Sequence, residues 1–166
     1  MRESIGGVWI TQLVIVFMFI FAAFLALSIN YSKAFRIKNE VLTMIEKGEG
    51  LTQNTRNMIG NYLRNNGYTM KGKCEKNSYG ITIKGVKNTE MELINDSNKN
   101  KKYHLCVSKF RSVSPNFPNR AYYEVRLFFK FNLPVLGNIS TFEVEGQSKD
   151  VSYPLDVEKI TPKSKE

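Results

Sequence analysis

The strongest pattern in the chain is an apolar run over residues 8–29, which contains no charged side chain. In a helix this run would span about 33 Å, close to the hydrocarbon thickness of a bilayer. Trp9 and Tyr31 stand near its two ends, where amphipathic rings favour the headgroup region. The pattern predicts a transmembrane helix.

The helical pattern continues beyond residue 29, but with apolar residues on one side only. Ala34, Ile37, Val41 and Met44 recur at spacings of three and four, in phase with the apolar run. The sequence Gly-Glu-Gly at 48–50 ends this pattern. We therefore predict one continuous helix from residue 8 to about residue 47, whose four recurring apolar residues are helix-packing positions beneath a sheet.

A second, shorter helix is predicted from a capping Thr52 to about residue 65. Met58, Ile59, Tyr62 and Leu63 give this helix an apolar side. We expect that side to face the rest of the domain.

From residue 68 the apolar period changes to two, which is typical of strands. The alternation is clearest over 123–131, where Phe128 is the exception. Shorter strands are predicted around 79–83, 91–93, 103–107 and 142–144, separated by polar or proline-containing loops at 95–102, 111–120 and 134–137. A sheet with one face on an apolar helix has this pattern.

Together these elements predict an α+β fold with a long N-terminal helix, a short second helix and an antiparallel β-sheet packed on the long helix. The predicted organisation is a short leader at 1–7, a transmembrane helix at 8–29 and its amphipathic continuation at 30–50. An extracytoplasmic α+β domain at 51–155 and a disordered tail at 156–166 follow.

Two alternatives concern the apolar run. It could be a cleaved signal peptide with a small-residue site at 26–28, but its length and the nearly neutral residues before it favour an uncleaved anchor. The orientation is also open. Lys33, Arg36 and Lys38 follow the run closely, and positive charges usually stay on the cytoplasmic side.

The cysteines and the net charge describe the part of the chain after the apolar run. Cys74 and Cys106 are the two cysteines, and they fit one disulfide in an oxidising compartment, or else two unrelated reduced thiols. The formal net charge of +9 would attract the domain to anionic surfaces, but the charges are scattered along the sequence, which favours a merely solvated surface. The cysteine pair favours a domain outside the cytoplasm.

Little in the sequence indicates catalysis. His104 and Cys106 lie two residues apart, but two cysteines and one histidine make an incomplete zinc set. We predict that His104 is a surface residue of an edge strand. The carboxylates expected on exposed strand faces are Glu124, Glu143, Glu145 and Asp150. No cofactor, metal or catalytic residue is predicted, and the alternation of the aromatic residues indicates a sheet core rather than a nucleic-acid site.

The predicted architecture resembles type IV pilin-like proteins, and more narrowly the TadE-like minor pilins of bacterial Tad pilus systems. Two stretches carry the likeness: Gly6-Gly7 followed by VWITQLVIVFMFIFAAF, and YYEVRLFFKFNLPVLGNISTFEVEGQS. The resemblance implies leader cleavage between Gly7 and Val8. Pilins of this kind usually carry a glutamate five residues into the mature chain, where this sequence has Gln12.

The function predicted from these features is structural. A membrane-anchored, pilin-like protein would act by helix packing and surface contacts, with Gln12, Ala22, Ala23 and Ala26 as packing positions within lipid. Its partners would be the lipid bilayer and other pilin or pilus-assembly membrane proteins, with the N-terminus cytoplasmic and the domain extracytoplasmic. The alternative is a single-pass anchored domain that binds anionic cell-wall polymer.

Overall fold

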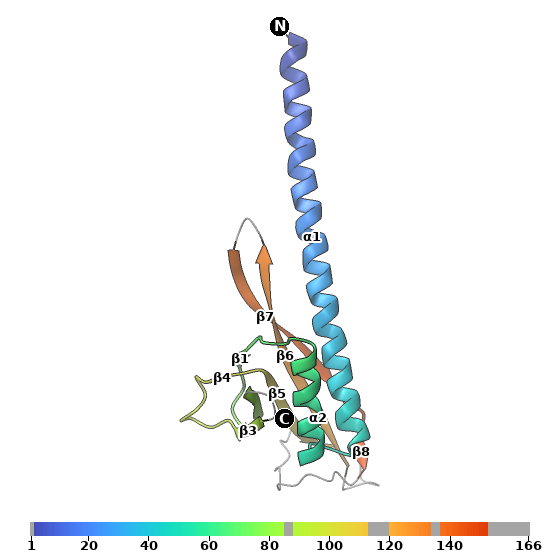
Figure 1. Cartoon of the computed structure of the whole chain (residues 1–166), viewed down its shortest axis with the longest axis vertical. Coiled ribbons are helices and arrows are strands. Elements are labelled where there is room, and N and C mark those ends of the chain that lie inside the picture. The colour runs from blue at the N-terminus through green and yellow to red at the C-terminus, as the bar shows by residue number, and fades with distance from the viewer. Residues whose placement is uncertain (1, 85–87, 113–119, 134–136, 153–166) are drawn as a thin grey trace.

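A computed structural model describes residues 2–84, 88–112, 120–133 and 137–152. The molecule consists of one long helix, α1 (Arg2–Lys47), whose C-terminal half lies against an α+β domain (Figure 1). The N-terminal half of α1 extends away from that domain. The predicted α+β class and the long N-terminal helix are confirmed.

Helix α1 is continuous over 46 residues, as the unbroken apolar phase predicted from residue 8 onward. It begins at Arg2, ahead of the predicted start, because extending a formed helix costs little compared with forming its first turn. At its end the Gly50 amide donates to the Ile45 carbonyl at 2.9 Å. Gly50 has φ 121°, a left-handed conformation that suits glycine and ends the helix where the sequence predicted.

Helix α2 (Gln53–Asn65) begins at the predicted cap, since the Thr52 hydroxyl accepts a hydrogen bond from the Thr55 amide at 3.2 Å. Ile59 and Leu63 are fully buried, but Met58 is 49% exposed. The predicted apolar side was therefore wrong at Met58, which lies about 100° around the helix from Ile59 on the side away from Leu63.

Among the described residues, six antiparallel strands form the main sheet, in the order β3-β2-β5-β6-β7 with β8 also paired to β6. Their bounds are β2 (Tyr79–Lys84), β3 (Asn88–Leu93), β5 (Leu105–Arg111), β6 (Arg120–Leu133), β7 (Gly137–Gln147) and β8 (Val151–Ser152). A separate ribbon pairs β1 (Gly72–Lys73) with β4 (Lys102–Tyr103).

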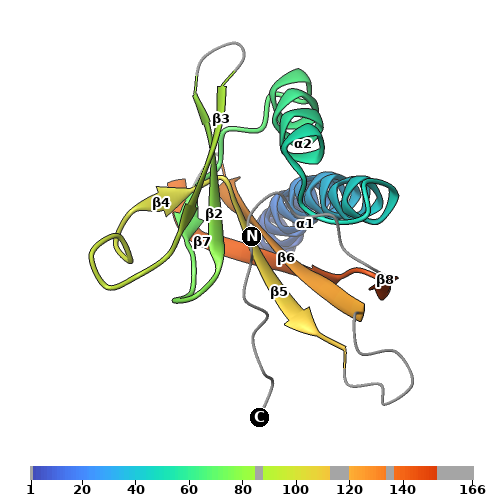
Figure 2. The same ribbon diagram turned by 90° about the horizontal axis from the view of Figure 1, so that it is seen from below.

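Both helices cover one face of the sheet (Figure 2). The main core forms where Ile37, Val41 and Ile45 of α1 meet alternate residues of β6, with Tyr123 and Leu127 fully buried among them. Helix α1 also passes close to β7. A Cβ on Gly146 of β7 would lie only 2.6 Å from the Cδ of Lys38. This packing confirms that the amphipathic half of α1 is covered by the sheet.

The sheet also has a smaller core away from the helices. Phe128, the exception to the alternation of β6, is fully buried there together with Tyr103, Ile94 and the two cysteines. The Tyr68 hydroxyl donates to the Phe128 carbonyl at 2.6 Å and accepts from the Phe128 amide at 2.8 Å. Phe128 is therefore a core residue of the opposite face rather than a break in the pattern.

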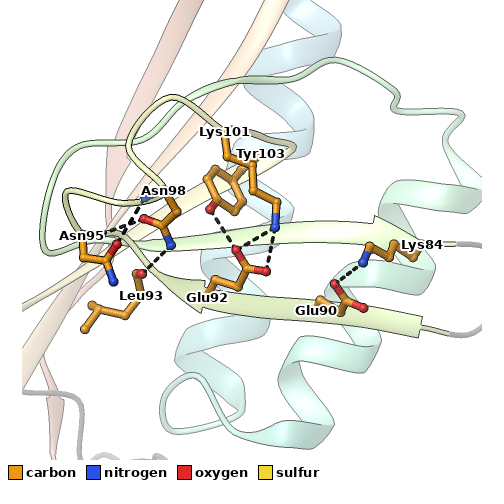
Figure 3. A network of polar contacts seen from close by, with 8 residues as sticks. All are labelled: Lys84, Glu90, Glu92, Leu93, Asn95, Asn98, Lys101 and Tyr103. Atoms are coloured by element: carbon orange, nitrogen blue, oxygen red, sulfur yellow. Dashed lines mark hydrogen bonds and ion pairs between the residues drawn. The ribbon is translucent and has the colours of Figure 1, made fainter.

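The predicted polar loop near 95–102 is held by its own side chains (Figure 3). The Asn98 amide nitrogen donates to the Leu93 carbonyl at 3.0 Å, and Lys101 forms an ion pair with Glu92 at 2.7 Å. Burial and the hydrogen bond to Glu92 raise the pKa of Tyr103 to about 12. The loop thus fixes β4 beside the end of β3.

Some predictions fall outside the described residues. They are the loop at 113–119, the turn at 134–136 and the tail at 156–166.

Candidate functional site

The candidate site is the N-terminal half of α1, because its apolar side chains are exposed on every side of the helix. Trp9 is 67% exposed, Phe17 66% and Ile29 68%. By length and composition α1 can cross a membrane, and none of its most apolar window is buried. The arrangement fits a single membrane anchor or a signal sequence, in agreement with the predicted apolar run.

The structure divides the predicted helix-packing residues into two groups. Ala34, Ile37 and Val41 are buried under the sheet at 4%, 2% and 0% exposure, and Met44 is half-buried at the edge of the same core. The other four lie on the free half of α1: Gln12 and Ala22 are exposed, and Ala23 and Ala26 are half-exposed. Only this second group remains accessible to another helix.

Polar groups near both ends of the apolar run bond to the helix itself. The Thr11 hydroxyl donates to the Gly7 carbonyl at 2.9 Å, and the Asn30 amide nitrogen donates to the Ala26 carbonyl at 3.0 Å. In a lipid environment such internal bonds lower the cost of a polar side chain. The run is therefore suited to lipid despite its polar residues.

The predicted cleavage position lies within this accessible helix. Gly7 is helical, and a Cβ on it would meet nothing within 4 Å. Val8 is 65% exposed. Packing within the described part of the chain therefore does not require glycine at position 7.

The predicted disulfide is present between Cys74 and Cys106, whose Cα atoms are 5.5 Å apart. It joins the segment after β1 to β5, across 32 residues of sequence. Because both sulfurs are bonded, Cys106 offers no thiol to act with His104.

The prediction of a surface histidine on an edge strand was wrong. His104 is only 5% exposed and lies between β4 and β5, where its Nδ1 accepts a hydrogen bond from the Ile83 amide at 3.2 Å. Burial, and then the charge of Lys71, lower the pKa of His104 to about 4. His104 is therefore neutral at ordinary pH. It lies in the domain interior because the adjoining strand β5 has a neighbour on each side and is not an edge strand.

Sequence reasoning missed a charged cluster around Arg126 of β6. Its Nε lies 2.7 Å from Glu145 and 3.5 Å from Glu143, and its Nη2 lies 2.9 Å from Glu75 and 3.9 Å from Glu124. Burial alone would lower the pKa of Arg126, but the Glu75 hydrogen bond and the charges of Glu75, Glu145 and Glu143 raise it. The spacing within one strand could not reveal this cluster, since the pairing of Arg126 with Glu145 depends on the register of β6 and β7.

Within the described residues, no group of three or more His, Cys, Asp or Glu side chains is placed to hold a metal ion. Comparisons with protein-family models, with curated proteins and with solved structures found no match. The architecture itself, a long apolar N-terminal helix packed against an antiparallel sheet, is pilin-like.

Proposed function

We propose that this protein is a membrane-anchored, pilin-like structural component of a bacterial Tad-type pilus system, either a minor pilin or an assembly component. The observation that supports this is one uninterrupted helix with an exposed apolar half and a half buried under the sheet. Such a helix connects the domain rigidly to lipid or to the helices of other subunits. The proposed role uses packing and surface contacts, without catalysis or a cofactor.

In this proposal the N-terminus is cytoplasmic and the domain is extracytoplasmic. The Cys74–Cys106 disulfide supports that orientation, because such bonds persist in oxidising compartments. The positive charges after the apolar run favour the opposite orientation. Lys38, however, is 7% exposed with its Nζ 4.0 Å from the centre of the Phe35 ring, so packing gives a separate reason for a lysine there.

Assembly would use the four accessible positions on the free half of α1. Ala22, Ala23 and Ala26 allow close approach of a second helix, and Gln12 can hydrogen-bond across the interface. Gln12 carries no charge, so it cannot form an ion pair with the N-terminal amine of a neighbouring subunit. If cleavage follows Gly7, that mature chain begins at Val8 and Gln12 is its fifth residue.

The alternative, a domain that binds anionic cell-wall polymer, draws its support from the net charge of +9. The surroundings of Arg126 argue against polymer binding on that part of the sheet. Four glutamates lie around this one arginine, and a polyanion would be repelled from that part of the sheet.

Photo-crosslinking in the native membrane tests the proposal. A photoreactive residue at Phe17, in the middle of the exposed run, should give adducts with other pilus proteins, and Gln12→Leu should reduce their yield. A photoreactive residue at Lys76 is the control, because it lies on the domain surface with a 59% exposed side chain.

Adducts at Phe17 with lipid alone would contradict the pilin-like role while leaving the anchor intact. Mass spectrometry of the same protein identifies its first residue. Val8 is expected, and an N-terminus at Met1 would contradict processing after Gly7.

A further inference from the structure

The C-terminal end of the apolar run in α1 lies next to a part of the sheet domain whose residue types suit a membrane surface. Ile29 is the last residue of the run, and Tyr31 and Phe35 follow it by about 3 Å and 9 Å along the helix axis. Tyr31 is 50% exposed and Phe35 43% exposed. If α1 spans a bilayer as far as Ile29, Tyr31 falls in the headgroup layer and Phe35 lies at its outer edge.

Strands β6 and β7 bring two more rings to this level. The Phe129 ring of β6 packs edge-on against Tyr31 with ring centres 6.1 Å apart. The Phe142 ring of β7 stacks on Phe129 at 5.5 Å and is itself 41% exposed. The rings therefore form one partly exposed aromatic cluster that joins strands β6 and β7 to helix α1.

The same hairpin extends beyond the rest of the sheet, along α1 and toward its N-terminus (Figure 1). The register continues to the pair Leu133 and Gly137, so the strands are joined as a hairpin at this end. No charged residue occurs in the sequence from 131 to 142. The part of the sheet nearest the apolar half of α1 is thus its least charged part.

Lysines flank the aromatic cluster. Lys33 of α1 and Lys130 of β6 are exposed, and both line a cleft of about 110 Å³ that also contains Asn30 and Phe129. Among the described residues, neither lysine forms an ion pair with a carboxylate. Aromatic rings beside unpaired lysines are typical of protein surfaces in contact with anionic headgroups.

We propose that Tyr31, Lys33, Phe129, Lys130 and Phe142, here called the interfacial collar, rest on the headgroup layer of an anionic leaflet. The domain would then contact the bilayer at a second place beside α1, which would fix the angle between the sheet and the membrane. Lipid is the favoured occupant because the collar continues directly from the exposed apolar run and has the opposite charge to anionic headgroups. The inference rests only on the anchor in a membrane, so it is independent of assembly into a pilus.

Depth-dependent fluorescence quenching of the full-length protein tests this contact. The chain has one tryptophan, Trp9, so Trp9→Phe provides a background for Phe142→Trp. In nanodiscs of equal parts phosphatidylcholine and phosphatidylglycerol, lipids brominated near the headgroup should quench this tryptophan severalfold. Met58→Trp in the same background is the control, since Met58 is exposed on α2, and little quenching is expected there.

The lysines provide the charge test. Lys33→Gln with Lys130→Gln should reduce the quenching of the tryptophan at 142 in the mixed nanodiscs, whereas Lys99→Gln with Lys102→Gln removes the same charge elsewhere and should leave it unchanged. Nanodiscs of phosphatidylcholine alone should give weaker quenching than the mixed ones. Equal, weak quenching at positions 142 and 58 in both lipids would overturn the proposal.

A second measurement avoids substitutions. Amide hydrogen exchange of the unmodified protein should slow at 128–133 and 137–143 on transfer from detergent to the mixed nanodiscs. Protection that appears only as protein concentration rises would indicate a second copy on the collar instead of lipid and would also overturn the proposal. Absence of pilus adducts at Phe17 would leave these results unaffected, so the two proposals fail separately.

Discussion

The two halves of α1 belong to one helix but lie in different surroundings. In the C-terminal half, Ile37, Val41 and Ile45 are at most 2% exposed, whereas Arg36, Asn39 and Glu40 are exposed. In the N-terminal half, Phe17 and Phe19 are exposed by 66% and 64%, and the residues around them are also apolar. An apolar stripe therefore marks a helix between a core and water, and an apolar surface all around marks a helix with no water beside it.

The cost of leaving the N-terminal half in water supports this difference. Sixteen large apolar side chains between residues 8 and 29 are exposed. Burying each one is worth about 1.5–3 kcal/mol, so together they represent tens of kcal/mol. A typical domain has only about 5–15 kcal/mol of net stability. Lipid or other helices must therefore cover this half when the protein is in its working environment.

The largest expected effect comes from placing the same charge in each half. Val41→Asp puts a carboxylate where the native side chain is completely buried, and we expect it to destabilise the domain by roughly 4 kcal/mol or more. Met44→Asp should cost less, because Met44 is half-buried. Unfolding of the full-length protein in detergent, followed by near-ultraviolet circular dichroism of the tyrosines, measures both.

Phe17→Asp is the matched variant in the other half. It should leave the unfolding midpoint of the domain unchanged and instead lower membrane insertion, because an acidic residue near the centre of a spanning helix costs roughly 2.5–3.5 kcal/mol. Extraction of membranes with alkaline carbonate measures that loss. If Phe17→Asp destabilised the domain as much as Val41→Asp, the two halves would not be independent.

The contrast between the halves could be predicted from the sequence because it depends on local periodicity. The same applies to the cap at Thr52, the helix end at Gly50 and the alternation of β6, which all depend on neighbouring residues. His104 and Arg126 could not be placed in this way. Their surroundings depend on which strands pair and in which register. The alternation of apolar and polar residues shows only which residues share a face of the sheet.

A smaller loss of domain stability than that of Val41→Asp is expected on removal of the disulfide, which acts on the domain half alone. Replacing Cys74 and Cys106 by alanine removes a link across 32 residues, and the loop-entropy relation gives a loss of about 3–4 kcal/mol. The unfolding midpoint should fall, while carbonate extraction should give the same membrane fraction as the native protein.

Thiol labelling of denatured protein taken directly from cells tests the compartment as well. No labelling without reductant and two labelled thiols after reduction are expected. Two free thiols without reductant would contradict both the native disulfide and the extracytoplasmic orientation, and would leave the positive charges after residue 29 as the better guide to topology.

The smallest expected effect is acid sensitivity of the domain half, caused by His104. Its pKa is lowered to about 4 in the folded domain and returns to about 6.5 on unfolding, so the unfolded chain binds the proton more readily between these values. Stability is therefore complete above pH 6.5 and falls as the pH drops toward 4. From linkage, the domain should be about 2 kcal/mol less stable at pH 5 than at pH 8.

His104→Asn retains a hydrogen-bond acceptor for the Ile83 amide but cannot take up the proton, so its unfolding free energy should vary less over this range. Denaturant unfolding of both proteins at pH 5 and pH 8 gives the comparison, and parallel pH curves would show that another group causes the acid sensitivity.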